Sequence, residues 1–169
     1  MVTHNSVAPQ MPRRDYMPTK DYHYTECGLD NVIIRNANFV AKDHDGEQVF
    51  HIPAVGMLHR AIAEGLINQP GTMTGPEIRF LRTEMGMTQS KMAELVHRDT
   101  QSVGRWERNE TPLEPPIDIL IRQLAAERLE LQLVAPFTTL SQLAQPNTVQ
   151  SQITIERTEN TDKPYAPAA

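Results

Sequence analysis

Three polar side chains between residues 100 and 105 are of the types that read the base edges of DNA. Gln101 can bond adenine through its amide, Arg105 can bond guanine O6 and N7, and Thr100 can contact a thymine methyl group. Each good contact of this kind contributes about 1–3 kcal/mol of discrimination between bases. Thr100, Gln101 and Arg105 are therefore our candidates for base reading.

Other polar residues nearby are suited to holding the sugar-phosphate backbone. Gln89 lies in the first turn of the preceding predicted helix, where its amide and a backbone N–H can meet a phosphate. Arg98 and Arg108 flank the candidate reading segment, and Ser102 lies beside the base-reading residues. Gln89, Arg98, Ser102 and Arg108 are our candidates for contacts to the DNA backbone.

The apolar residues of the same stretch are placed to pack it onto a scaffold. Val103 and the only tryptophan, Trp106, are three residues apart and so share the inward face of a helix. Ala93 is small where two helices must approach closely. We expect Ala93, Val103 and Trp106 to support a reading helix. Two short helices joined by a tight turn would then present the N-terminal half of the second helix to the major groove.

Signals for helix ends divide residues 74–134 into consecutive helices. A capping box formed by Thr74 and Glu77 begins the first helix. Residues 100–108 form the third helix, and Pro115 opens a longer fourth one. This half of the chain is therefore predicted to be an all-α domain.

Residues 21–70 are predicted to form a small β-β-α unit. The alternating segment around Asp45 and Gly46 predicts a hairpin with a two-residue turn, which places Ala41 opposite Phe50. Apolar residues at helical spacing follow the hairpin. A core of about 50 residues is marginal alone, so we assign this unit to dimerisation or to binding a partner.

The two ends of the chain are predicted to be flexible. Seven of the thirteen prolines fall in residues 1–20 and 136–169, among many Ser, Thr, Gln and Asn residues. We therefore predict a disordered tail at 1–20 and a mostly disordered tail at 135–169. The segment 148–158 alternates as an edge strand on a partner would, but we favour the disordered interpretation.

Residues 74–131 resemble the helix-turn-helix domain of the Cro/C1-type (Xre) repressor family. The resemblance rests on "RFLRTEMGMTQSKMAELV", on "TQSVGRWE" and on the proline-led helix that follows. It implies a lambda-repressor-like fold. It also implies a phosphate contact at the position of Gln89 and base contacts at the positions of Thr100, Gln101 and Arg105.

The same resemblance implies an ion pair between the first helix and the end of the third, here Arg82 and Glu107. Such a pair orients the reading helix more than it adds stability. The chain departs from the family pattern at His97 and Asn109, where the family has glycine. Asn tolerates the left-handed backbone conformation, and His is less comfortable there.

The layout of the first half is similar to that of bacterial regulators related to MqsA-type antitoxins. "YHYTECGLDNVIIRN", a hairpin and a helix precede "TGPEIRFLR", as a small module precedes a helix-turn-helix domain in that group. Its zinc-binding members use paired CxxC motifs, whereas Cys27 is the only cysteine here. We therefore carry over the layout alone and predict no metal and no cofactor.

Composition limits the remaining classes of protein. The formal charge is −5, so a DNA-binding surface has to come from local arrangement. The sequence has no run of about 18 apolar residues and no apolar stretch typical of a secretory signal. We expect a cytoplasmic protein without membrane contact, associated with the bacterial nucleoid when bound to DNA. No residue pattern typical of catalysis is present, so we do not expect an enzyme.

These features together predict an α+β protein, with a small β-hairpin and helix unit followed by a lambda-repressor-like domain and flexible tails. The predicted function is that of a sequence-specific transcriptional regulator, acting as a repressor. It would read a palindromic operator in double-stranded DNA as a homodimer, because one reading helix contacts only a few base pairs. An alternative is an antitoxin or antiactivator that masks a toxin or regulator protein, with autoregulatory DNA binding secondary.

Overall fold

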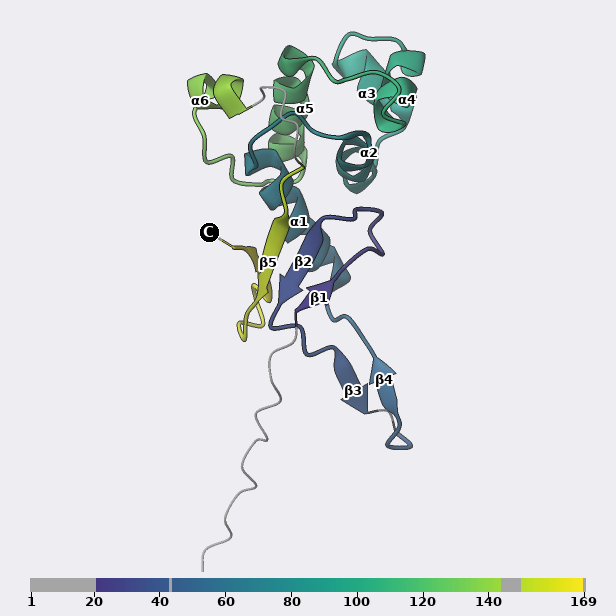
Figure 1. Cartoon of the computed structure of the whole chain (residues 1–169), viewed down its shortest axis with the longest axis vertical. Helices are drawn as coiled ribbons and strands as arrows, with labels where there is room; N and C mark the ends of the chain where they lie inside the picture. Colours follow the sequence, from purple (N-terminus) through teal and green to yellow (C-terminus); the bar gives the residue numbers. More distant parts are fainter. Residues whose placement is uncertain (1–20, 43, 144–149, 169) are drawn as a thin grey trace, which may run out of the picture.

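The computed structural model of the chain describes residues 21–42, 44–143 and 150–168. Within these residues the fold is α+β, as predicted, with a four-stranded sheet, a two-stranded hairpin and six helices. Helices α2 to α6 gather at one end of the molecule and the strands at the other (Figure 1). The predicted tail at 1–20 lies outside the described residues.

The elements follow one another in a simple order. The strands are β1 (Tyr22–His23), β2 (Val32–Arg35), β3 (Val40–Lys42), β4 (Gln48–Phe50), β5 (Ile153–Arg157) and β6 (Tyr165–Pro167). The helices are α1 (Val55–Asn68), α2 (Gly75–Glu84), α3 (Gln89–Leu95), α4 (Thr100–Glu107), α5 (Pro115–Arg128) and α6 (Phe137–Leu143). All six helices therefore lie in the chain between β4 and β5.

The four-stranded sheet brings together strands from both ends of the described chain. Its order is β1-β2-β5-β6, and β2 runs parallel to β5 with Ile34 opposite Ile155. Ile153 and Ile155 are buried, at 4% and 0% exposure. The prediction of a mostly disordered tail at 135–169 is therefore wrong for α6, β5 and β6. The alternation did mark a strand, but β5 pairs with β2 of its own chain and has neighbours on both sides.

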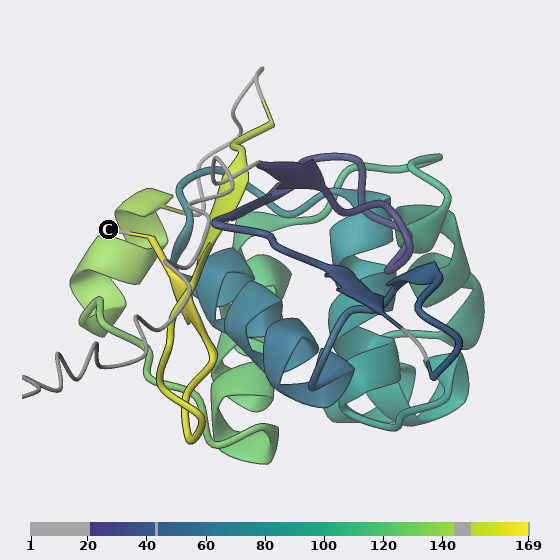
Figure 2. The same cartoon turned by 90° about the horizontal axis from the view of Figure 1, so that it is seen from below.

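Helix α1 packs against the sheet and connects it to the other helices. It contacts β5 and β6 as well as α2 and α5 (Figures 1 and 2). Ile62 and Leu66 share one core with the buried residues of the sheet. Gly65 permits a close approach, because a Cβ there would lie 3.1 Å from Cγ2 of Ile153. The sheet of residues 21–70 is thus completed by β5 and β6, which the predicted division of the chain placed in the C-terminal tail.

The hairpin of β3 and β4 forms where predicted but in a different register. Ala41 pairs with Val49 and not with Phe50. Gly46 has a φ of 82°, whereas Asp45 is not among the described residues with positive φ. The expected two-residue turn needs positive φ at both residues, so it does not form. The pairs of β3 with β4 run to Lys42 opposite Gln48, one residue out of the predicted register.

A hydrogen-bonded chain of three side chains ties the sheet end to the helical end. The Tyr24 hydroxyl lies 2.8 Å from Nε2 of His59, and Nδ1 of His59 lies 2.8 Å from Oε1 of Glu84. The Glu84 carboxylate can only accept, so Nδ1 of His59 donates to it, and in the neutral ring Nε2 accepts from the Tyr24 hydroxyl. The loop after β1, α1 and α2 are thereby held in one arrangement.

A buried ion pair on α5 holds the connection between α1 and α2. Arg122 and Asp118 both have side chains with 0% exposure, and Nε of Arg122 donates to Oδ2 of Asp118 at 2.6 Å. The other guanidinium nitrogens donate to the carbonyl oxygens of Ile67, Gln69 and Gly71. The connection is therefore fixed by Arg122 and by Asp118, whose Oδ1 accepts from the N–H of Met73 at 2.8 Å.

Candidate nucleic-acid interface

Helices α3 and α4 each begin at a side-chain cap. The Thr88 hydroxyl accepts from the backbone N–H of Lys91 at 3.1 Å. Asp99 does the same for the N–H of Ser102 at 2.9 Å. Between the two helices His97 has a φ of 53°, the left-handed conformation that the missing glycine would have adopted without strain. The two helices contact each other directly.

The inner face of α4 is buried against the rest of the helical region. Val103 is 0% exposed and Trp106 is 4% exposed. Ala93 of α3 is 2% exposed, in keeping with a close contact between the helices. These three residues therefore occupy the buried positions predicted for them, and the tryptophan fixes α4 by its inward side.

Glu107 is the polar anchor of that inner face. Its side chain has 0% exposure, and Nε and Nη2 of Arg82 donate to its two carboxylate oxygens. The expected pair of Arg82 and Glu107 is therefore confirmed. Two further partners were not anticipated: Nε2 of Gln89 donates at 2.8 Å, and Nε of Arg79 forms an ion pair at 3.5 Å. Glu107 thus links α4 to both α2 and α3.

These donors outweigh the effect of burial on the carboxyl of Glu107. Burial raises the pKa, but the hydrogen bonds from Arg82 and Gln89 and the charges of Arg82 and Arg79 lower it. The net pKa lies below the ordinary value of 4.5. The ionised carboxylate therefore stabilises the folded state above that pH, and this contribution is lost as the pH falls through the lowered pKa.

We expect Glu107→Gln to lower the free energy of unfolding at neutral pH by about 1–3 kcal/mol, because a neutral amide replaces the carboxylate that binds Arg82. The variant should also lose less stability than the wild type between about pH 7 and about pH 3. Urea unfolding across this range measures both effects. The matched control is Glu94→Gln on exposed α3 surface, where the side chain is 69% exposed. Equal acid sensitivity of Glu107→Gln and the wild type would contradict the assignment.

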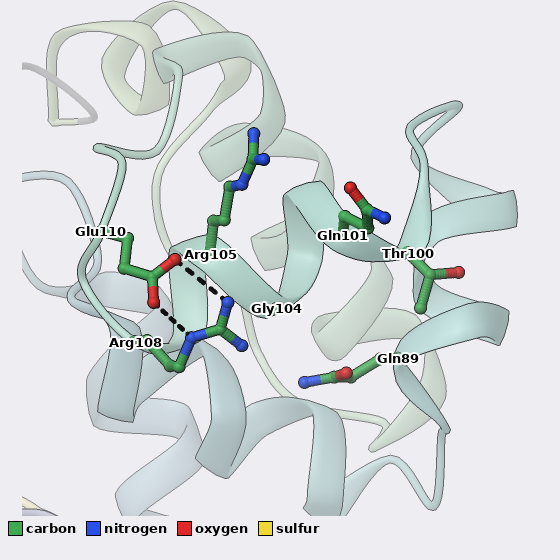
Figure 3. A pocket seen from close by; sticks show the side chains of 7 residues that line it. All are labelled: Gln89, Thr100, Gln101, Gly104, Arg105, Arg108 and Glu110. Atoms are coloured by element: carbon green, nitrogen blue, oxygen red, sulfur yellow. Dashed lines mark hydrogen bonds and ion pairs between the residues drawn. The ribbon is translucent and has the colours of Figure 1, made fainter.

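The outer face of α4 borders an open hollow of about 490 Å³ (Figure 3). The residues around it come from α3, from α4 and from the turn after α4, and they are Gln89, Thr100, Gln101, Gly104, Arg105, Arg108 and Glu110. All three candidates for base reading border the hollow. Glu110 was not anticipated as part of this surface.

The candidates for backbone contacts are divided between the hollow and its surroundings. Gln89 and Arg108 border the hollow, although the amide nitrogen of Gln89 already donates to Glu107. Ser102 lies outside it, and its hydroxyl donates to Oδ2 of Asp99 at 2.7 Å. Arg98 also lies outside it and pairs with Glu114 at 2.9 Å.

A contact between Gly75 and Asn109, which the sequence did not predict, holds the end of α4. The backbone N–H of Gly75 donates to Oδ1 of Asn109 at 2.6 Å. A Cβ at Gly75 would clash with the backbone carbonyls of Trp106 and Glu107. Asn109 has a φ of 56°, so it takes the left-handed place of the expected glycine and adds a cap to α2. Asn109 stands out in the sequence as a departure from the family pattern, but Gly75, which it binds, lies 34 residues away.

Comparison with known proteins adds no relative. No family model, curated protein or solved structure matches the chain. Among residues 21–42, 44–143 and 150–168, no group of three or more His, Cys, Asp or Glu side chains is placed to hold a metal ion. No helix in this part of the chain is long and apolar enough to span a membrane. The geometry of α3 and α4 therefore has to carry the functional interpretation.

Proposed function

We propose that the protein is a sequence-specific DNA-binding transcriptional regulator in which α3 and α4 act as a helix-turn-helix unit. The outer face of α4 enters the major groove, and Thr100, Gln101 and Arg105 read base edges there. The protein binds a palindromic operator as a homodimer in the cytoplasm and represses transcription by covering a promoter. No metal, cofactor or catalytic step takes part.

One observation carries this proposal: Arg105 is exposed and forms no hydrogen bond or ion pair through its side chain with any described residue. Lys91, Arg98 and Arg108 by contrast are each paired with a carboxylate. An unpaired guanidinium beside exposed hydroxyl and amide groups is what base recognition requires. The opposite side of α4 supports the proposal because burial and the Glu107 contacts keep the helix in one orientation.

Sequence-specific binding can be tested by gel shift with the DNA upstream of the protein's own coding region. The shift is measured at two salt concentrations, with scrambled duplex of equal length and composition as competitor. We expect a discrete complex that resists the competitor and a footprint with two half-sites one helical turn apart. Binding that the scrambled duplex removes equally well would contradict the proposal.

Replacing Arg105 separates the recognition of bases from the general electrostatic attraction to duplex DNA. We expect Arg105→Ala to lower the preference for the operator over scrambled DNA by about 1–3 kcal/mol, since a bidentate base contact is lost. Gln89→Ala should weaken binding to both duplexes alike, because a phosphate contact carries no sequence information. Competition titrations with the two duplexes give the ratio. An equal loss on both duplexes for Arg105→Ala would exclude it as a base reader.

A second candidate function rests on exposed apolar side chains in the hairpin and at the start of α1. Phe50, Val55 and Met57 are 53%, 41% and 42% exposed. Exposed apolar side chains of this size are candidates for contact with a protein partner. An antitoxin or antiactivator would use them to mask its partner. Stoichiometric co-purification of one protein that is lost on Phe50→Ser and Met57→Ser would favour this function.

A further inference from the structure

The guanidinium of Arg108 is already bound by a carboxylate at the edge of the hollow. Its Nε and Nη2 donate to Oε1 and Oε2 of Glu110 at 2.6 and 3.0 Å (Figure 3). Both side chains are half-exposed, at 52% and 49%. Two parallel N–H···O bonds to one carboxylate form the same fork that arginine offers to a phosphate.

The backbone at the end of α4 places Glu110 in this position. Asn109 has a φ of 56°, which reverses the chain, and the N–H of Glu110 then donates to the carbonyl of Arg105 at 2.9 Å. Gly104 leaves room for the arginine, because a Cβ there would lie 3.1 Å from Nη1 of Arg108. The pair is thus held beside the reading face by the turn and by the glycine.

The charges around the hollow agree with this arrangement. The hydrogen bonds between the two side chains raise the pKa of Arg108 and lower that of Glu110, and the charge of Arg105 also lowers the pKa of Glu110. Residues 74–131 contain ten acidic and eight basic side chains. Their bulk charge therefore does not attract DNA, and single cations have a large influence on duplex binding.

We propose that Glu110 competes with DNA phosphate for Arg108 and thereby limits the general affinity of the protein for duplex DNA. The inference rests on the proposed function, since it assumes that the face of α4 meets DNA. A DNA phosphate can bind Nε and Nη2 of Arg108 only after the Glu110 carboxylate has released them. Discrimination then depends on Thr100, Gln101 and Arg105, because Arg108 contributes little to binding at unrelated sequences.

The test measures binding of the full chain to a duplex of unrelated sequence by fluorescence anisotropy over a range of salt concentrations. We expect Glu110→Gln to bind roughly three- to tenfold tighter and to steepen the slope of log K against log salt by about 0.9, the value for one added phosphate contact. The matched control is Glu156→Gln, which removes the same charge from the partly exposed pair of Arg35 on β2 and Glu156 on β5, at the sheet end (Figure 1).

A double variant distinguishes competition from simple repulsion. In an Arg108→Ala background, Glu110→Gln should lose most of its gain in affinity and its change in salt slope. Unchanged binding of Glu110→Gln, a gain equal to that of Glu156→Gln, or a gain that persists without Arg108 would overturn the inference.

The same titrations separate this inference from the proposed function. A gain in Glu110→Gln without preference for the upstream DNA would leave the inference standing and remove sequence-specific reading. A preference for the upstream DNA without the gain in affinity would support sequence-specific reading and overturn the inference about Glu110. Absence of duplex binding in every variant at low salt would overturn both.

Discussion

Ending the chain at residue 149 is expected to abolish the cooperative unfolding of the sheet end. The truncation removes the buried side chains of Ile153, Ile155 and Tyr165, which contribute about 1.5–3 kcal/mol each by burial. Their sum of roughly 5–9 kcal/mol is comparable with the total stability of an ordinary domain. It also leaves β2 with an unpaired edge and α1 with an exposed apolar face. Urea unfolding followed by circular dichroism, with hydrogen exchange at the β2 amides, measures the loss.

Two controls separate loss of the strand from loss of chain length. A synthetic peptide of residues 150–169, added to the truncated chain, should restore protection of the β2 amides. In the full chain, Ile155→Asn should be severely destabilising and Thr154→Asn mild, because these neighbours point to opposite sides of the sheet. If the truncated chain unfolded with the midpoint and slope of the full chain, the central place of β5 would be wrong.

The second large effect is expected at the buried arginine of α5. Arg122→Met should lower the free energy of unfolding by about 3–5 kcal/mol, because it leaves the buried carboxylate of Asp118 without its counter-charge. The carbonyls of Ile67, Gln69 and Gly71 lose their donors in the same step. Chemical denaturation of the full chain gives the change directly.

The matched control for this variant lies on the same helix. Arg128→Met replaces an exposed arginine in the last turn of α5 and should change stability by less than about 0.5 kcal/mol. A double variant that also replaces Asp118 by Asn should recover part of the loss, since the unpaired charge is then gone. Similar effects of the two arginine variants would show that the three carbonyls find other donors.

Features whose signals are local in the sequence were predicted well. The capping box of Thr74 and Glu77 begins α2, and α4 begins at Thr100 as predicted. Each of these depends on side chains within a few residues of the backbone groups that they bind. The polar and buried faces of α4 follow from helical spacing alone, so all three candidates for base reading were found on one surface.

Features that depend on distant partners were not predicted. The alternation around Ile155 shows that a strand is present but not which strand it joins. The role of Gly75 depends on the backbone of the far end of α4, and that of Arg122 on three carbonyls in another connection. The hairpin register failed for a different reason, because turn length was assumed from Asp45 and Gly46 and one residue of error shifts every pair.

The parallel pairing of β2 with β5 also has a consequence for the order in which the molecule folds. The helices between these strands form from neighbouring residues and can assemble quickly, whereas Ile34 and Ile155 must meet across the whole helical region. The entropy of closing such a long loop delays this contact until α1 and its neighbours have packed. The rate-limiting step of folding is therefore expected to be insertion of β5 beside β2. Until it occurs, the intermediate has a complete α4 and an open strand edge that can join another chain.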